Sequence, residues 1–125
     1  MKIQIIGLPC SGKTTAIKEF LKTKENILYI DIKDYEGKKR QTEYRKDIQK
    51  ASQPIIAESA CGVNIKNTHI IRLEVPVHVV YTRSMNRDNL IDEDYMSLLE
   101  GQMLPAKYTV TTREALIKLL DNLLM

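Results

Sequence analysis

Short apolar runs alternate with longer stretches that mix apolar and polar residues along the 125-residue chain. Each run is short and rich in β-branched residues, as is typical of a strand that is buried on both faces. The five runs are residues 3–6, 27–30, 55–57, 70–75 and 107–110. Because strands that alternate with helices form βαβ units, the pattern predicts an α/β domain built on a parallel sheet.

The stretches between the runs carry apolar residues at helical spacing. Helices are expected through Ala16 and Leu21, over 35–52, from Pro76 towards Arg87, from Asp92 to about Gly101, and from Thr111 towards the end of the sequence. In the fourth helix, we expect Tyr95, Leu98 and Leu99 to face inward. In the last, Thr111 and Glu114 have the spacing of a capping box.

Composition indicates one globular domain over residues 1–125. Hydrophobic residues make up 43% and charged residues 28%, an ordinary balance for a folded protein. No apolar run approaches the roughly 20 residues of a membrane span. The first run leads directly into a glycine motif rather than into a signal-peptide cleavage site. We therefore expect a cytoplasmic protein with no membrane partner, in which Cys10 and Cys61 are reduced thiols; composition leaves the oligomeric state open.

The stretch Gly-Leu-Pro-Cys-Ser-Gly-Lys-Thr at 7–14 matches the phosphate-loop motif G-x-x-x-x-G-K-[ST]. Its glycines allow backbone N–H groups to surround a phosphate, and the following helix directs its positive end at the same anion. In such loops the lysine, here Lys13, reaches the β- and γ-phosphates, and the hydroxyl of Thr14 binds Mg²⁺. The predicted nucleotide-binding residues of this loop are Gly7, Pro9, Cys10, Ser11, Gly12, Lys13, Thr14 and Thr15.

Other motifs narrow the class of nucleotide-binding protein. A GTPase is expected to read guanine through an Asn-Lys-x-Asp box, and the nearest string, residues 64–67, ends in asparagine instead. Motor and AAA-type ATPases need a longer chain. The remaining class is a phosphotransferase that uses ATP and Mg²⁺ and acts on a small acceptor.

From Met1 to Met125 the chain resembles the small P-loop kinases of the nucleoside-monophosphate-kinase, shikimate-kinase and dephospho-coenzyme-A-kinase superfamily. Besides the phosphate loop, the resemblance rests on Ile-Ile-Arg-Leu-Glu-Val-Pro at 70–76, followed by Arg83 and Arg87, and on the ending that begins at Tyr108. It implies a three-layer P-loop NTPase fold whose five-stranded parallel sheet has the order 2-3-1-4-5. A short lid is expected around 84–104.

The resemblance also implies roles for two arginines. Arg83 and Arg87 are four residues apart and therefore share one helix face. In the resembling kinases the first stacks on adenine, and the second reaches the phosphates near the lid. A planar, always charged guanidinium suits both tasks. Arg83 is accordingly a predicted nucleotide-binding residue, and Arg87 joins Lys13 as a predicted catalytic residue; the alternative is a solvent-exposed helix face.

Two carboxylates each close an apolar run. Asp31 ends the second run and Glu58 the third, where a carboxylate can hold Mg²⁺ or accept the proton of an attacking hydroxyl. In the implied strand order the third strand lies beside the first, which favours Glu58, with Thr14, as the metal-side group and Asp31 as the catalytic base. Shikimate kinases carry Asp-x-Asp where this chain has Asp31-Ile32-Lys33. This departure argues against shikimate as the acceptor; the alternative for both residues is an ordinary acid at a strand end.

The net charge of +3 lies within one segment, because residues 33–50 contain seven basic and four acidic residues. In the resembling kinases this part of the chain builds the acceptor pocket. An anionic acceptor such as a nucleotide or nucleoside would find cations there among Lys38, Lys39, Arg40 and Arg45; the alternative is a solvated helix. The sequence thus predicts an ATP-dependent kinase for a small, anionic acceptor. The competing interpretations are a polynucleotide end kinase and a non-catalytic ATP-binding regulatory module.

Overall fold

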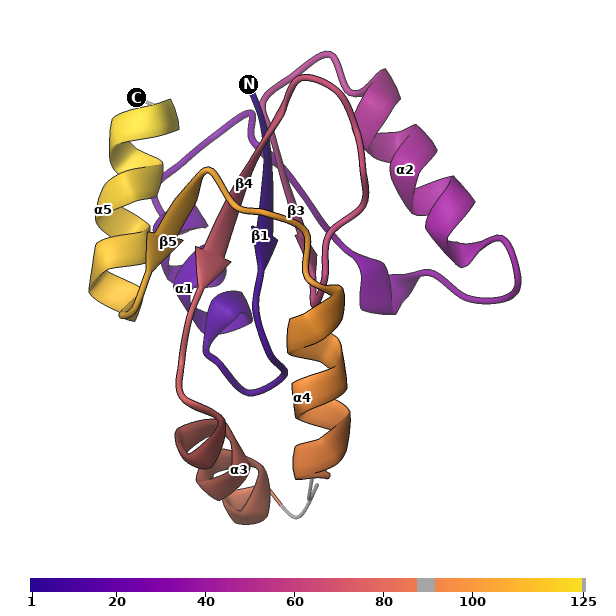
Figure 1. Ribbon diagram of the computed structural model, residues 1–125. Helices are drawn as coiled ribbons and strands as arrows, with labels where there is room; N and C mark the ends of the chain where they lie inside the picture. Colours follow the sequence, from indigo (N-terminus) through magenta and orange to yellow (C-terminus); the bar gives the residue numbers. More distant parts are fainter. Residues whose placement is uncertain (88–91, 125) are drawn as a thin grey trace.

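The computed structural model describes residues 1–87 and 92–124 (Figure 1). Its strands are β1 Lys2–Ile6, β2 Leu28–Asp31, β3 Ile55–Ser59, β4 Thr68–Leu73 and β5 Tyr108–Val110. Its helices are α1 Lys13–Leu21, α2 Arg40–Lys50, α3 Val77–Asn86, α4 Glu93–Gln102 and α5 Arg113–Leu124, with a 3₁₀ turn, η1, at Ile32–Asp34. The five strands are parallel in the order β2-β3-β1-β4-β5, which confirms the predicted α/β fold and strand order.

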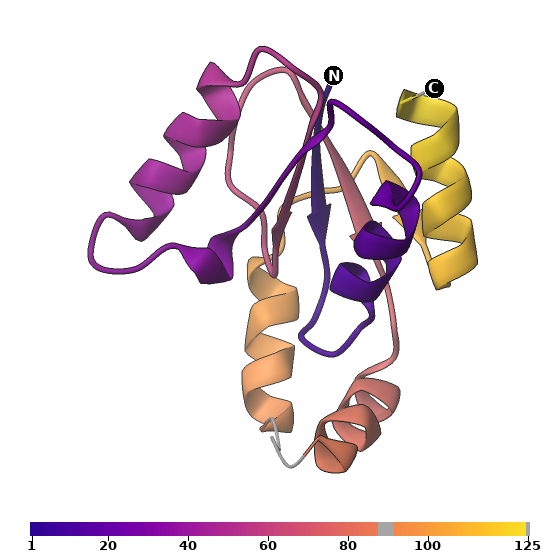
Figure 2. The ribbon, with the colours of Figure 1, turned by 180° about the vertical axis from the view of Figure 1, so that it is seen from behind.

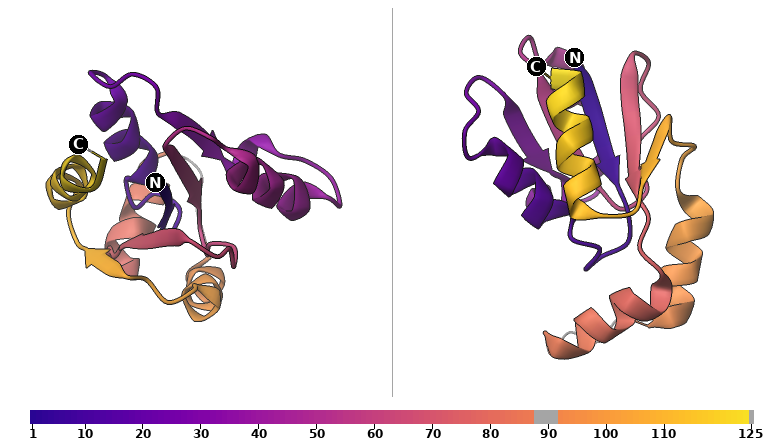
Figure 3. Two further views of the ribbon diagram at one scale, coloured as in Figure 1. Left: turned by 90° about the horizontal axis from the view of Figure 1, so that it is seen from above. Right: turned by 90° about the vertical axis from the view of Figure 1, so that its left-hand side faces the viewer.

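Helices α1 and α5 cover one face of the sheet, as Figure 2 shows from behind. Alternate residues of the central strands point into this layer, so Ile3 and Ile5 of β1 pack with Ile17 of α1 and Leu116 of α5. On the other face, α2 covers the β2–β3 side through Tyr44 and Ile48. Figure 3 shows α3 beyond the carboxyl ends of the strands. None of the helices in the described residues is long and apolar enough to span a membrane.

The connection from β3 to β4, residues 60–67, contains no helix, and a buried amide holds it against the sheet instead. Gln4 of β1 is fully buried and faces this connection. Its Nε2 donates to the Val63 carbonyl oxygen at 2.8 Å and to Thr68 Oγ1 at 3.0 Å, and its Oε1 accepts from the Val63 N–H at 2.9 Å. The side chain therefore satisfies backbone groups that burial would otherwise leave unpaired.

Helix α2 begins at Arg40 rather than at residue 35, where the sequence pattern placed its start. The chain first forms η1, which the Asp31 carboxylate caps, and then passes Gly37 at a φ of +85°. A positive φ is incompatible with a right-handed helix, so the helix can start only after this turn. The polar pattern alone carried no sign of the interruption.

Two expectations for the C-terminal half are wrong. Tyr95 and Leu98 are 51% and 58% exposed, and α4 buries Met96 and Leu99 against the phosphate-loop residue Leu8 and against α3. Apolar residues lie on both sides of α4, so packing rather than periodicity decides which side is inside. Helix α5 is capped by Thr112, whose hydroxyl oxygen accepts the Ala115 N–H at 3.1 Å, and not by Thr111. Residues 88–91 of the expected lid lie outside the described residues.

Replacement of Gln4 by alanine tests the role of the buried amide. We expect Gln4→Ala to lower the free energy of unfolding by about 1–3 kcal/mol, because the Val63 N–H and C=O lose their partners inside the protein. The control is Gln41→Ala, which shortens an exposed glutamine of α2. Urea unfolding measures both; equal stabilities of the two variants would show that Gln4 does not hold the connection.

Gly7, directly after β1, offers a second test because a Cβ there would lie 2.7 Å from the Leu73 carbonyl oxygen at the end of β4. We expect Gly7→Ala to cost about 1–3 kcal/mol of stability, since backbone atoms must shift to relieve this contact. Gly101→Ala is the matched control, because a Cβ at this α4 position meets nothing within 4 Å. It should stabilise the protein by roughly 0.5–1 kcal/mol. Thermal melts of both variants decide; a harmless Gly7→Ala would contradict the close approach.

Candidate active site

The phosphate loop leaves the carboxyl end of the central strand β1 and ends at the first residue of α1. Gly12 at a φ of +100° and Cys10 at +62° turn the chain back over the helix. Gly12 stands at the N-cap of α1 and supplies no side-chain oxygen to the first N–H groups. The first N–H groups of α1 therefore have no side-chain acceptor at the N-cap, the arrangement with which helix N-termini in phosphate loops bind anions.

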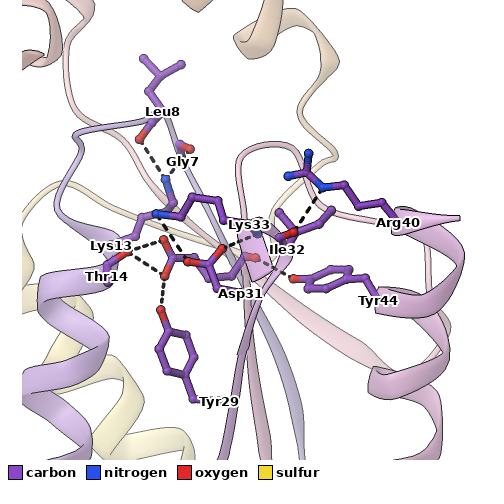
Figure 4. A network of polar contacts seen from close by, with 11 residues as sticks. Gly7, Leu8, Lys13, Thr14, Tyr29, Asp31, Ile32, Lys33, Arg40 and Tyr44 are labelled. Carbon is purple, nitrogen blue, oxygen red and sulfur yellow. Dashed lines mark hydrogen bonds and ion pairs between the residues drawn. The ribbon is translucent and has the colours of Figure 1, made fainter. Parts of the chain in front are cut away.

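Lys13 is held inside this loop. Its Nζ donates to the carbonyl oxygens of Gly7 at 2.7 Å and Leu8 at 2.9 Å, as Figure 4 shows, and the residue is only 7% exposed. Burial lowers the pKa of Lys13 to about 8, and the charge of Glu58 offsets part of that effect. A bound phosphate would compensate the buried ammonium. The buried hydroxyl of Ser11, which has no hydrogen-bond partner among the described residues, fits the same ligand.

Glu58 lies at the centre of a buried hydrogen-bond network. It sits near the end of β3, is 4% exposed, and accepts from the Thr14 hydroxyl at 2.7 and 3.0 Å to its two oxygens. The Tyr29 hydroxyl donates to its Oε1 at 2.5 Å (Figure 4). Burial and the bond to Glu58 raise the pKa of Tyr29 far above its usual value, so this hydroxyl remains a donor. Thr14 and Glu58, both predicted as metal-side residues, are thus in contact.

Tyr29 is not among the site residues that the sequence predicts. The available signal was its position two residues before Asp31 on a predicted strand, because residues two apart point to the same face of a sheet. Aromatic residues are common in strands, however, so this signal alone predicts a core residue. The hydrogen bond from the Tyr29 hydroxyl to Glu58 follows only from the parallel pairing of β2 with β3, which aligns Asp31 with Glu58.

Asp31 ends β2 and is 8% exposed. Its Oδ1 accepts the Lys33 N–H at 3.0 Å, and its Oδ2 lies 3.6 Å from Lys33 Nζ. With Glu58 and the phosphate loop it lines a cavity of about 390 Å³. The candidate base and the phosphate loop therefore line the same cavity.

A second cavity, of about 440 Å³, opens on the other side of the same loop. Arg83 of α3 lines it and donates from Nη1 to the carbonyl oxygens of Cys10 at 3.2 Å and Ser11 at 3.1 Å. Arg87 follows the helix, with its Nη1 3.8 Å from Cys10 Sγ, and it lines both cavities. The far wall consists of Thr111, Thr112, Arg113 and Glu114. Both predicted arginines thus lie against the phosphate loop.

The basic segment reaches the 390 Å³ cavity at two points only. Arg40, at the start of α2, lines it together with Lys33. Lys38, Lys39 and Arg45 are exposed and lie outside its lining. The turn at Gly37 explains the difference, because it places residues 38 and 39 in an outer loop before α2 begins.

The donor set suits a magnesium ion that arrives with a nucleotide. Thr14 and Glu58 offer oxygen ligands, which Mg²⁺ prefers, and Mg²⁺ commonly takes only one or two protein ligands and completes its shell with phosphate oxygens and water. Within the described residues there is no group of three or more His, Cys, Asp or Glu side chains that could hold a metal ion without a nucleotide.

Solved structures with the same fold include several small kinases. A shikimate kinase from Bacteroides thetaiotaomicron superposes with a TM-score of 0.68 and 15% sequence identity, over 99% of this chain and 98% of that one. A shikimate kinase from Aquifex aeolicus gives a TM-score of 0.66 and 20% identity, over 99% and 96% of the two chains. A gluconokinase from Sinorhizobium meliloti gives 0.64 and 10%, over 98% and 95%.

No protein-family model and no curated protein sequence matches the chain. At identities of 10–20% the structural likeness concerns the fold. It agrees with the parallel order β2-β3-β1-β4-β5, with the helices on both faces, and with a phosphate loop between β1 and α1. The chain has the three-layer fold of the small P-loop kinases, as its sequence motifs predicted.

Proposed function

We propose that this protein is a kinase that transfers the γ-phosphoryl group of ATP to a hydroxyl of a small, anionic acceptor, such as a nucleotide or nucleoside. The observation that carries the proposal is the pair of cavities on the two sides of one phosphate loop, with Arg87 lining both. A kinase needs this arrangement, because donor and acceptor must meet at the phosphoryl group in transit. The same fold in shikimate kinase, gluconokinase and a sugar kinase supports a small-molecule acceptor.

In this proposal ATP occupies the 440 Å³ cavity and the phosphate loop. Arg83, already held over the loop by the carbonyl oxygens of Cys10 and Ser11, offers a flat surface for adenine. The phosphates lie against the N-terminus of α1. Thr14 and Glu58 hold Mg²⁺, which neutralises developing charge on the phosphate oxygens when it is bound.

The transfer step places the acceptor in the 390 Å³ cavity. Its hydroxyl oxygen bonds to the γ-phosphorus, the bond to the β,γ-bridging oxygen breaks, and ADP leaves with that electron pair. Asp31 takes the hydroxyl proton. Lys13 and Arg87 stabilise the negative charge that spreads over the phosphoryl oxygens. Because phosphoryl transfer requires little covalent help, positioning and charge account for most of the catalysis.

The substitution Lys13→Ala tests the assignment directly. We expect kcat to fall by at least about 10²-fold, because the phosphoryl group loses a preorganised charge. The fold should persist, as judged by circular dichroism. Lys18→Ala, which removes an exposed lysine from the same helix, is the control and should keep full activity.

Three results would contradict the proposal of a small-molecule kinase. Unchanged turnover in Lys13→Ala excludes this phosphate loop as the catalytic centre. Tight ATP binding without acceptor-dependent ADP release indicates a regulatory module. Oligonucleotide binding that weakens steeply with salt, together with end phosphorylation, indicates a polynucleotide kinase.

The Tyr29–Glu58 bond generates a prediction about Mg²⁺. We expect Tyr29→Phe to raise the Mg²⁺ concentration needed for half-maximal activity by about 10-fold, because outer groups that orient a metal-side carboxylate typically contribute this much. Thermal stabilisation by Mg²⁺ in the presence of a non-hydrolysable ATP analogue should shift in parallel. ATP binding without Mg²⁺ should not change.

Tyr35→Phe is the matched control for this prediction. Tyr35 also donates its hydroxyl to a carboxylate, that of Asp47 on α2, but Tyr35 directly follows η1 and both residues lie outside the lining of both cavities. Removal of that hydroxyl should leave the Mg²⁺ requirement at the wild-type value. An equal effect of the two substitutions would show that Tyr29 has no special role towards the metal.

A further inference from the structure

Two cations of the acceptor-side cavity have no part in the transfer described above. The lining of this cavity contains four basic residues and two carboxylates, Asp31 and Glu58. The proposed function uses Lys13 and Arg87 for the phosphoryl group. Lys33 and Arg40 remain, and they lie at the end of the cavity formed by the segment that follows β2.

Arg40 is oriented by its backbone contact. Its Nε donates to the Ile32 carbonyl oxygen at 3.2 Å, as Figure 4 shows, which leaves the two terminal nitrogens of the guanidinium as donors. In the described part of the chain no carboxylate forms an ion pair with Arg40 within 4.0 Å. A guanidinium held in this way presents the forked geometry that binds a carboxylate or a phosphate with two parallel hydrogen bonds.

Lys33 connects this end of the cavity to Asp31. Its Nζ is 3.6 Å from Asp31 Oδ2, and its side chain is 69% exposed. An ammonium has three donors, so Lys33 can contact Asp31 and a ligand at the same time. An anion at the usual charge-assisted distance of about 2.8 Å from Lys33 would lie within about 6 Å of Asp31. The anion and the reacting hydroxyl therefore fit on one small molecule.

Part of the cavity lining is apolar. Tyr95 and Leu99 of α4 belong to this part, and Tyr95 is 51% exposed. The aromatic ring that the sequence pattern assigned to the core thus faces the cavity. A half-exposed tyrosine suits a ring-shaped ligand body, because it supplies a flat apolar surface at little cost in conformational entropy. A cavity of about 390 Å³ is also of the size that holds a small metabolite.

We infer that Lys33 and Arg40 form an anion subsite for the acceptor, which is a ring-bearing hydroxy compound with a carboxylate or phosphate group and a hydroxyl directed at Asp31. Lys33 is the specificity-determining residue, because among the described residues it is the one cation of the cavity lining that forms an ion pair with the proposed base. This inference rests on the proposed function and names the acceptor class and the residues that recognise it.

The test compares acceptors that differ only in charge. The panel contains glucose, glucuronate and glucose 6-phosphate, which share one ring and carry a neutral, a carboxylate and a phosphate group at the same carbon. Shikimate with its methyl ester, and cytidine with cytidine 5′-monophosphate, extend it. Binding is measured as thermal stabilisation with a non-hydrolysable ATP analogue present, and turnover as ADP release with the product identified by mass spectrometry.

We expect the compound that stabilises the wild-type protein most against heat to be an anionic one. Its thermal stabilisation should be well above that of the neutral compound with the same ring. Lys33→Met should lower kcat/KM for this anionic acceptor by about 10- to 100-fold, the range for loss of one hydrogen bond to a charged group, and should reduce its preference over the neutral partner. Lys46→Met is the control, since this exposed lysine of α2 lies outside the cavity lining. Comparison of the carboxylate-bearing acceptors with the phosphate-bearing acceptors shows which of the two anionic groups the subsite binds.

Other outcomes separate this inference from the kinase proposal. Phosphorylation of neutral members at equal or higher rates, or a Lys33→Met variant that behaves like Lys46→Met, overturns the anion subsite and leaves the kinase standing. The absence of any stabilisation by the anionic members overturns it as well. Lys33-dependent stabilisation by an anionic member without ADP release supports the subsite and overturns the kinase.

Discussion

The parallel pairing of β1 between β3 and β4 is the constraint on which the rest of this structure depends. It aligns Ile5 with Glu58 and Ile6 with Ser59, so the phosphate loop begins where β3 delivers its carboxylate. The first turn of α1 then brings Thr14 to Glu58. The connections between successive strands, through α1, through α2, through the buried segment held by Gln4 and through α3 with α4, keep all strands parallel, and their carboxyl ends meet at one edge. Ligand sites of open α/β sheets form at this edge for the same reason.

The two buried charged groups at that edge, Lys13 and Glu58, are satisfied to different extents. Lys13 is buried against neutral carbonyl oxygens and has a lowered pKa, which is unfavourable until an anion arrives. Glu58 is buried too, but two hydroxyl donors satisfy it. The carboxylate thus has its donors within the protein, whereas the Lys13 ammonium has no carboxylate partner among the described residues and the N-terminus of α1 has no side-chain cap. Such imbalance is what distinguishes a binding site from a structural ion pair.

Helices α3 and α4 convert the loop into two separate cavities. Arg83 bonds to the loop from one side, and α4 packs on Leu8 through Met96 and Leu99. The ion pair of Arg72 on β4 with Glu100 at 3.3 Å fixes α4 against the sheet. The division of the site into two cavities therefore depends on packing between segments that are far apart in sequence.

Local sequence signals determined the strands and the phosphate loop, because each depends on residues close together in the chain, and the alternation of strands with helices predicted the parallel sheet. The motif at 7–14 dictates its own geometry through its glycines and the following helix. Only tertiary structure decided that Tyr95 is exposed and that the Tyr29 hydroxyl donates a hydrogen bond to Glu58. It also decided that Lys33 and Arg40 line the cavity whereas Lys38 and Lys39 do not. Periodicity shows that a helix has apolar sides, and charge counts show where cations cluster. Which side is buried, and which cation faces a cavity, depends on contacts across the sheet and on the turn at Gly37, which helical periodicity does not show.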